Sequence, residues 1–133
     1  MSEYFQHFKG IYPRVDIVHR FDISSRSHIS DDVKTVIYRV VQEALNNIGK
    51  HSGADTVKVE MLERRNKLLL KIEDNGCGFE ASKVLDTDQP LMGYGIHSMK
   101  ERIEICNGTF QLESAPGKGT LISASIPKKR KLH

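Results

Sequence analysis

The sequence has no tryptophan, only four prolines and only two cysteines among its 133 residues. Cys77 and Cys106 stand in no metal-binding or redox spacing, so we expect no disulfide framework and a reducing compartment. Apolar runs are a few residues long, far below the ~18 residues that a membrane-spanning helix requires. The N-terminus lacks the apolar centre of a signal peptide. The motifs of P-loop NTPases, HExxH metalloproteases and GxSxG hydrolases are also absent.

Charge is unevenly distributed along the chain. The formal net charge is +3, but residues 128–131 supply four of the 20 Lys and Arg residues, and without them the 17 Asp and Glu residues would be in slight excess. The body of the chain is therefore not a basic nucleic-acid-binding domain. A chain of this length buries roughly 65–70% of its extended surface in one domain. We expect residues 1–12 to be the remnant of a linker helix, 13–127 to form the domain and 128–133 to form a solvated basic tail.

The clearest element is a helix that begins after Ser30. Ser30 is a good N-cap, and the two aspartates that follow suit the positive first turn. Apolar residues then recur at intervals of three and four and form one broad face: Val33, Val36, Ile37, Val40, Val41, Ala44, Leu45 and Ile48. The helix should end near His51, with Gly53 as its C-terminal stop. A second helix is expected to follow Gly95 and to end at Asn107.

Alternation of apolar and polar residues predicts strands elsewhere. One strand is expected over 14–22, with Val15, Ile17 and Phe21 on one face. A hairpin is formed by 57–61 and 68–72, which are joined by a turn at 64–67, and two further strands cover 109–114 and 120–126. We interpret residues 80–92 as a mobile loop. Helices and mostly antiparallel strands in two layers make an α+β sandwich.

Asn47 is a polar residue on the apolar face of the first helix. At about 100° per residue it falls within the apolar stripe, and Glu43 lies about 40° away. A buried amide without a partner carries a desolvation penalty of ~1–3 kcal/mol. Asn47 is therefore either a structural residue bonded to backbone or an oxygen ligand for a hard cation such as Mg²⁺. In the second interpretation Glu43 lies beside the metal, and Lys50, one turn further on, reaches phosphate.

Two glycine-rich turns lie in the second half of the chain. Asp74-Asn75-Gly76-Cys77-Gly78 follows a strand, and its glycines permit positive φ and close approach of the backbone to a flat ligand. The carboxylate of Asp74 could accept a hydrogen bond from an exocyclic amine. Gly93-Tyr94-Gly95 precedes a helix and offers free backbone N–H groups to a phosphate. Each signal is weak alone, because an ordinary turn has the same composition.

In combination, four segments resemble the motifs of the GHKL ATPases. Residues 42–52, Gln-Glu-Ala-Leu-Asn-Asn-Ile-Gly-Lys-His-Ser, resemble the N box, and 74–79, Asp-Asn-Gly-Cys-Gly-Phe, resemble the G1 box. Residues 93–102 resemble the G2 box, and 114–120, Ser-Ala-Pro-Gly-Lys-Gly-Thr, resemble the closing Gly-Thr segment. The segments Glu-Ala-Leu-Asn-Asn and Met-x-Glu-Arg are similar to those of one branch of the family, the sensor histidine kinases that pair with helix-turn-helix response regulators. The likeness covers residues 30–127.

This resemblance implies the Bergerat fold, a mixed, mostly antiparallel sheet covered by helices on one face. ATP would lie between the helices and a lid formed by residues 80–92. Asn47 would hold Mg²⁺. Glu43 would be a further metal ligand or a water positioner, whereas in ATP-hydrolysing relatives a glutamate at this place activates water. Lys50 would complete the catalytic set by meeting the phosphates.

The resemblance also implies which residues bind ATP. Asp74 would accept the adenine N6 amine, Gly78 would back the ring, and Thr120 would support the Asp74 contact. Gly93 and Gly95 would meet the phosphates, as would His51. The full implied ATP-binding set is Asn47, Lys50, His51, Asp74, Gly76, Gly78, Gly93, Tyr94, Gly95, Ile96 and Thr120.

The kinase family phosphorylates a histidine, and the chain shows no such acceptor. None of its six histidines is followed by an acidic residue, so the chain is expected to be a fragment or to act in trans. The implied function is to bind Mg-ATP and to donate the γ-phosphate to a histidine on a separate phosphoacceptor dimerisation domain. A response regulator, and no nucleic acid, would be the further partner. The domain would be cytoplasmic, whether or not its parent protein is anchored in the membrane.

Two other functions remain open at this point. One is a stand-alone serine kinase of the anti-sigma type, which has the same fold and phosphorylates a serine of a partner protein. The other is a non-catalytic binding module that uses nucleotide only as a conformational switch. Supplying different acceptors would separate the three.

Overall fold

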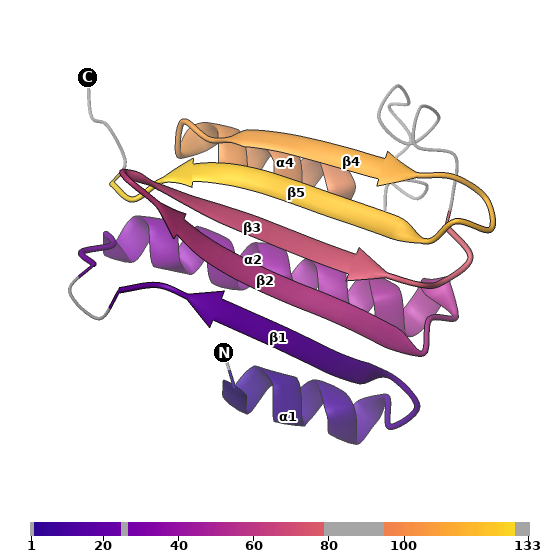
Figure 1. The fold of residues 1–133 in the computed structure, drawn as a ribbon. Coiled ribbons are helices and arrows are strands. Elements are labelled where there is room, and N and C mark those ends of the chain that lie inside the picture. Colours follow the sequence, from indigo (N-terminus) through magenta and orange to yellow (C-terminus); the bar gives the residue numbers. More distant parts are fainter. Residues whose placement is uncertain (1, 25–26, 79–94, 130–133) are drawn as a thin grey trace.

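The computed structural model describes residues 2–24, 27–78 and 95–129. The element order is α1 (Ser2–Ile11), β1 (Asp16–Asp22), α2 (Asp31–Asn47), η1 (Ile48–Ser52), β2 (Thr56–Arg64), β3 (Lys67–Asp74), α4 (Ile96–Ile105), β4 (Thr109–Ser114) and β5 (Thr120–Pro127) (Figure 1). Each helix and strand predicted within the described ranges is present, with ends that differ by a few residues. The expected loop at 80–92 and the glycine turn residues Gly93 and Tyr94 lie outside the described residues.

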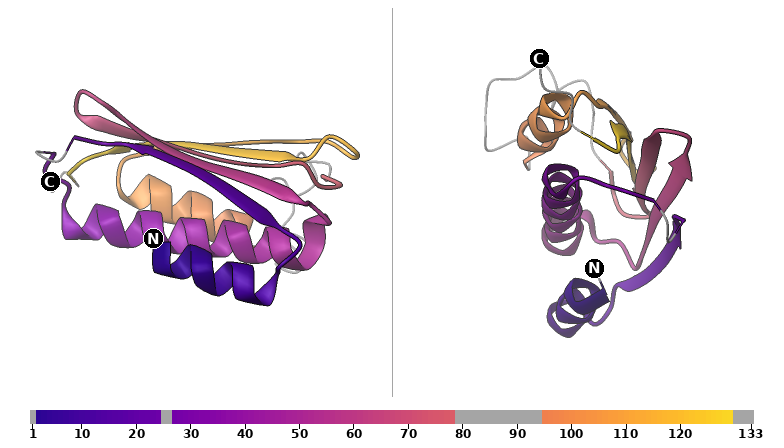
Figure 2. Two further views of the ribbon diagram at one scale, coloured as in Figure 1. Left: turned by 60° about the horizontal axis from the view of Figure 1, so that its bottom comes forward. Right: turned by 90° about the vertical axis from the view of Figure 1, so that its left-hand side faces the viewer.

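The five strands form one sheet in the order β1-β2-β3-β5-β4. Only β1 and β2 are parallel, and the other neighbours are antiparallel. A parallel pair needs a long crossover connection, and α2 supplies it between β1 and β2. Figure 2 shows that α1, α2 and α4 all lie on the same side of the sheet. The predicted two-layer sandwich with a mixed, mostly antiparallel sheet is confirmed.

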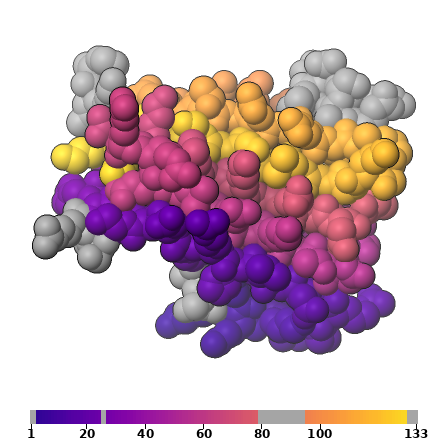
Figure 3. All heavy atoms as spheres, viewed as in Figure 1, coloured from indigo at the N-terminus to yellow at the C-terminus, as the bar shows by residue number. Residues whose placement is uncertain are grey.

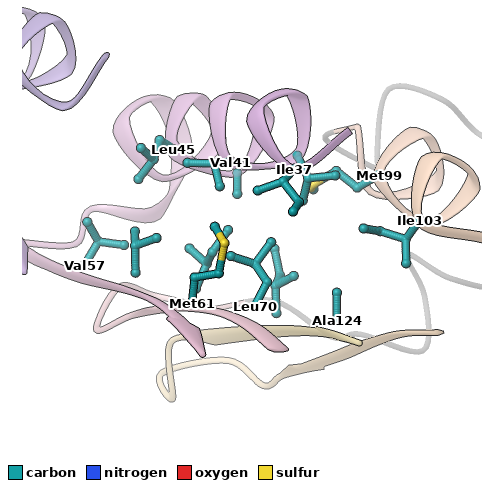
Figure 4. Packing of buried hydrophobic residues seen from close by; sticks show 14 of the residues in the cluster. Ile37, Val41, Leu45, Val57, Met61, Leu70, Met99, Ile103 and Ala124 are labelled. Carbon is teal, nitrogen blue, oxygen red and sulfur yellow. The ribbon is translucent and has the colours of Figure 1, made fainter. Parts of the chain in front are cut away.

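The core lies between the inner face of the sheet and the apolar stripe of α2. Ile37, Val41 and Leu45 point from α2 towards alternate residues of β2 and β3, while Met99 and Ile103 extend the layer from α4 (Figure 4). Burial of each such side chain stabilises the fold by ~1.5–3 kcal/mol relative to an exposed position. Among the described helices, none is long and apolar enough to cross a membrane.

The N-terminal helix packs onto the domain. Phe8 is 1% exposed and Phe5 is also buried, so α1 contributes directly to the core. Val15 is buried just before β1 begins, but Phe21, which the alternation placed on the same face, is 40% exposed. The reason is that β1 is an edge strand, where Phe21 meets the rings of Phe5 at 6.2 Å and of His19 at 5.5 Å but is not covered by a neighbouring strand on its outer side.

Lys128, which the sequence analysis placed in the basic tail, is held by the fold. Its ammonium pairs with the carboxylate of Glu63 on β2, its amide donates to Asn66 O, and its carbonyl accepts from Ser30 N at 3.0 Å. These contacts tie the end of β5 to the N-cap of α2. The Lys128 partner holds the pKa of Glu63 down at about 2. Of the remaining tail, 130–133 lie outside the described residues.

Candidate nucleotide site

A cavity of about 100 Å³ lies where the end of α2, the end of β3, the start of β5 and the start of α4 meet. In Figure 1 these parts of the elements lie towards the right-hand end of the ribbon. Ile72 and Ile122 form apolar wall, and several polar side chains converge on the same space. The lining residues are Ala44, Asn47, Ile48, His51, Ser52, Ile72, Asp74, Cys77, Gly78, Ile96, Thr120 and Ile122. An apolar slot with few convergent polar groups is typical of a small-molecule site.

Asp74 is the last residue of β3 and its side chain is buried, with 6% exposure. Its Oδ1 accepts a hydrogen bond from Gly76 N at 2.8 Å. Burial raises the pKa of the carboxyl group, and the charge of Glu73 adds to this, while the Gly76 bond opposes it. A buried carboxylate facing a cavity is a strong acceptor for a ligand that brings its own N–H group.

The turn from 74 to 78 is held from both sides. Cys77 N donates to Ser52 O at 2.7 Å, and Gly117 N donates to Cys77 O at 2.6 Å. Gly78 has a φ of +65°, and a Cβ at this position would overlap the carbonyl groups of Ala115 and Gly119. The turn therefore requires glycine at 78, as the motif predicted, and its backbone forms one wall of the cavity.

The long helix changes its winding where it reaches the site. The α-helical part ends at Asn47, and η1 continues as a π-helix to Ser52. Ser52 Oγ donates to Ile48 O at 2.9 Å and accepts from Ala54 N at 3.0 Å, and Gly53 stops the segment with a φ of +67°. The predicted end and the glycine stop are confirmed. The π-winding has no periodic signature in so short a segment, and π-turns are frequent at functional sites.

Glu43 faces a neighbouring hollow of about 230 Å³ between α2 and α4, with Arg39 and Arg102 on its rim. The backbone of Gly95 lies directly against the Glu43 carboxylate, so that a Cβ on Gly95 would stand 2.6 Å from Glu43 Cδ. Glu43 and Asn47 are four residues apart and share a helix face. The helix thus presents an acid and an amide to adjacent spaces at the start of α4.

Thr120 faces Asp74 across the β3–β5 pair. Its hydroxyl shares a hydrogen bond of 2.8 Å with Ser114 Oγ, which also donates to Gly119 O at 2.9 Å. The two hydroxyls fix the tight β4–β5 connection beside Asp74. The sheet register thus places Thr120 next to Asp74, and the predicted support of an adenine contact by Thr120 stays a prediction.

The structure brings together six of the predicted residues around the cavity: Asn47, His51, Asp74, Gly78, Ile96 and Thr120. Lys50 is exposed in the middle of η1 and Gly76 packs on Ser52, and neither of them lines the cavity. Ser52 also lines the cavity, and the sequence analysis did not single it out, because a serine before a helix-ending glycine has many roles. The alternation of β3 and β5 could have found Ile72 and Ile122.

A larger, shallow hollow of about 930 Å³ lies over the opposite face of the sheet, and charged side chains line much of it. Lys58 and Glu73, which are paired across β2 and β3, both lie on this face and are exposed. Figure 3 shows this uncovered face, where β2, β3 and β5 form the surface. Asp74 also contributes to its lining, but most of the other lining side chains are exposed or part-exposed, several of them charged, so we interpret this hollow as a solvated surface.

The fold defines the class of the protein, which is an α+β sandwich with a small cavity of apolar and polar lining at one end of its sheet. Residues 32–130 match the family described as histidine kinase-, DNA gyrase B- and HSP90-like ATPases. The chain belongs to this family, as its motifs predicted, and its role is that of an ATP-binding catalytic domain.

Relatives of known description are sensor histidine kinases. The chain is 32% identical over 124 residues to the oxygen sensor histidine kinase NreB of Staphylococcus carnosus, which covers 93% of this chain and 34% of NreB. It is 36% identical over 127 residues to the sensor histidine kinase LiaS of Bacillus subtilis, which covers 96% of this chain and 33% of LiaS. The chain thus spans about a third of the length of these relatives.

Solved structures show the same fold. The blue-light activated histidine kinase of Erythrobacter litoralis superposes with a TM-score of 0.74 at 18% identity, over 98% of this chain and 41% of that chain. The ATP-binding domain of PrrB from Mycobacterium tuberculosis superposes with a TM-score of 0.69 at 23% identity, over 92% and 86%. The expected Bergerat architecture is confirmed by these superpositions.

Proposed function

We propose that this domain binds Mg-ATP and donates the γ-phosphate to a histidine on a separate domain of a two-component sensor kinase. The observation that carries the proposal is the Asp74 carboxylate, buried at the end of β3 and facing an apolar cavity. Leaving such a group without a ligand partner is unfavourable, and a flat base with an exocyclic amine complements it.

The adenine end of the site is built from Asp74, Gly78 and Thr120. One oxygen of Asp74 is oriented by the Gly76 N–H, which directs the carboxylate for the N6 amine. The backbone of Gly78 brings no side chain between the turn and the ring. Thr120, beside Asp74 in the sheet, supports the same contact through its hydroxyl.

The phosphate end would be formed by Asn47, Lys50 and His51, with Glu43 next to it. In the described ranges, no cluster of three or more His, Cys, Asp or Glu side chains could hold a metal on its own. Mg²⁺ is commonly held by one or two protein oxygens together with substrate phosphates, and the amide of Asn47 and the carboxylate of Glu43 are hard oxygen donors of this kind. The residues therefore fit an ion that arrives with the nucleotide, where it would neutralise phosphate charge.

In the transfer step, the chain's own residues would position the nucleotide and neutralise the charge of its phosphates. Lys50 would hold the terminal phosphates as a cation, Asn47 would orient the metal-bound oxygens, and Glu43 would order water or metal beside Gly95. Phosphoryl transfer needs little more from a protein than such positioning and charge neutralisation. The acceptor histidine would come from a phosphoacceptor dimerisation domain, and a response regulator would receive the phosphoryl group next.

The relatives support this setting. They are named as sensor histidine kinases and are about three times as long as this chain, which leaves room in them for an acceptor domain. Because the donor is ATP, the domain would work in the cytoplasm, also where the parent protein is anchored in a membrane.

Calorimetric titration with ATP, in the presence and absence of Mg²⁺ and with GTP as the control nucleotide, tests the binding step. Adenine-selective, Mg²⁺-dependent binding is expected. Asp74→Asn should lose it, whereas Glu73→Gln is a matched control because the same charge is removed from the adjacent, exposed residue. Binding of GTP as tight as that of ATP would overturn the adenine assignment.

The transfer step is tested by mixing the domain with radiolabelled ATP and a histidine-containing dimerisation domain from a homologous kinase. Acid-labile, base-stable labelling of that domain is expected. Labelling of serine in a partner protein would instead favour a serine kinase, and ATP binding without transfer to any acceptor would favour a nucleotide-dependent binding module.

A further inference from the structure

The ring of Tyr12, just after α1, packs against the backbone of Gly49 in η1. A Cβ on Gly49 would lie 2.5 Å from Cε2 and 2.7 Å from Cδ2 and Cζ of this ring. Gly49 does not have a positive φ, so an alanine would be accepted by the local backbone conformation. Glycine is needed at 49 because of the Tyr12 ring, and not because of the turn.

Tyr12 is fixed by the end of α1. Its amide donates to Phe8 O at 2.8 Å, and its carbonyl accepts from Val15 N at 3.0 Å. The rings of Tyr12 and Phe8 have centroids 5.0 Å apart, and Phe8 is 1% exposed in the core. The Tyr12 ring is therefore a rigid support and not a loose surface side chain.

The other side of η1 is anchored to the glycine turn of the nucleotide site. Ser52 O accepts from Cys77 N at 2.7 Å, and Ser52 Oγ is bonded within η1 to Ile48 O. Lys50 and His51 lie between these two supports, directly after Gly49. A π-turn is less regular than an α-helix, so the direction of its side chains depends on what holds it.

We propose that Tyr12 is a positioning residue for the phosphate end of the site. Its ring sets η1 so that Lys50 and His51 meet the nucleotide phosphates, while it touches neither nucleotide nor metal. The proposal rests on the phosphate role of Lys50 in the proposed function. It makes α1, which is far from the adenine contacts in sequence, part of the nucleotide site.

The test compares dissociation constants for Mg-ATP and for adenosine, which lacks phosphates. Tyr12→Ala is expected to weaken ATP binding by roughly tenfold, the scale of one charge-assisted contact, and to change adenosine binding less than about twofold. Tyr12→Phe keeps the ring and should bind both ligands as the unmodified domain does. Tyr38→Ala, the same change at a part-exposed residue of α2 remote from η1, is the matched control. Lys50→Ala is the reference for a lost phosphate contact.

Gly49→Ala provides a second, independent variant. Its added methyl should displace η1 from Tyr12 and weaken ATP binding selectively, as Tyr12→Ala does. In the double variant the ring that the methyl meets is gone, so its loss of ATP affinity should be no greater than that of Tyr12→Ala alone. Such non-additivity is the mark of two residues in contact.

Several results would overturn the proposal. If Tyr12→Ala weakens the binding of ATP and of adenosine equally, Tyr12 is merely structural. If Tyr12→Phe weakens ATP binding as much as Tyr12→Ala does, the support does not come from the ring. If the losses of ATP affinity add up in the double variant, Tyr12 and Gly49 do not act through their contact. If Lys50→Ala weakens ATP binding and Tyr12→Ala does not, only the positioning role of Tyr12 is wrong. If Lys50→Ala binds ATP normally, the phosphate assignment in the proposed function fails with it.

Discussion

The α-carbon of Gly95 lies against the side chain of Glu43, where a methyl group would stand 2.6 Å from Glu43 Cδ and 2.8 Å from Cγ. Gly95 also has a φ of +75° as the N-cap of α4. The contact joins the start of the second nucleotide-facing helix to an acid of the first. It follows that the position of Glu43 depends on the absence of a side chain at 95.

Gly95→Ala should therefore destabilise the domain more than Gly117→Ala, which is measurable by urea unfolding. Both glycines have similar φ values, +75° and +78°, so each alanine carries left-handed strain of roughly 1–2 kcal/mol. Gly117 has open space where its methyl would go, whereas overpacking at 95 adds about 1–3 kcal/mol. The added loss should disappear in Glu43→Ala/Gly95→Ala. Equal losses in the two single variants would show that the Glu43 contact has no energetic weight.

Asp74→Asn should separate binding from stability. We expect ATP affinity to fall by ~1.5–3 kcal/mol, because a charge-assisted hydrogen bond becomes a mismatched amide contact. Burial raises the pKa of Asp74, so its ionised form destabilises the ligand-free fold at pH values above that raised pKa. The variant should consequently melt at a higher temperature at neutral pH, as measured by calorimetry without nucleotide. Weaker ATP binding with a lower Tm would instead point to general damage.

The pH dependence of ATP binding follows from the same carboxylate. The ionised form is the better acceptor, so affinity should decrease as the pH is lowered through the raised pKa of Asp74. Titrations with adenosine isolate this effect, because adenosine carries no phosphate that titrates. A pH-independent adenosine affinity across the acidic range would remove Asp74 from the adenine contact.

Asn47→Ala should mainly reduce the Mg²⁺ dependence of ATP binding. The amide lines the cavity at the end of α2, and removal of one oxygen ligand weakens the ion that arrives with the nucleotide. The measurement is the ratio of ATP affinities with and without Mg²⁺. Asn46→Ala, on the exposed side of the same turn, is the control. If the ratio is unchanged in Asn47→Ala, the residue is structural.

Glu63 should make the fold sensitive to acid. Its pKa is lowered from 4.5 to about 2, chiefly by Lys128, so it stabilises the folded state fully above pH 4.5. That contribution is lost as the pH falls from 4.5 towards 2. Glu63→Gln should lower the free energy of unfolding at neutral pH and flatten its pH dependence in this window. If denaturant titrations give Glu63→Gln the same pH dependence of the free energy of unfolding below pH 4.5 as the unmodified domain, the pairing with Lys128 is contradicted.

Much of the fold could be predicted from the sequence, because its signals are periodic. The three-and-four spacing of Val33 to Leu45 specified both the helix and the face that it buries. The exposure of Phe21 could not be predicted, since alternation shows which face a residue occupies and not how fully another element covers that face. Lys128 is similar, because its partner Glu63 is far away in the sequence.

The candidate site could be predicted residue by residue where a motif constrains the backbone. Gly78 is such a case, since its positive φ follows from the local glycine-rich sequence. The π-winding of η1 and the contact between Tyr12 and Gly49 are tertiary features. They depend on what packs around five residues, and no local pattern encodes that.

β1 is an edge strand that pairs only with β2, and six of its seven residues are exposed, whereas β3 lies between β2 and β5. Segments with few buried contacts and exposed backbone hydrogen bonds open first. Amide hydrogens of β1 and α1 should thus exchange with solvent well before those of β3, although Phe8 is buried. Because Tyr12 belongs to this edge unit, its detachment would withdraw the support of η1 while the adenine pocket stays folded. Local opening of this edge unit would thus lower the affinity for the phosphates while the rest of the domain stays folded.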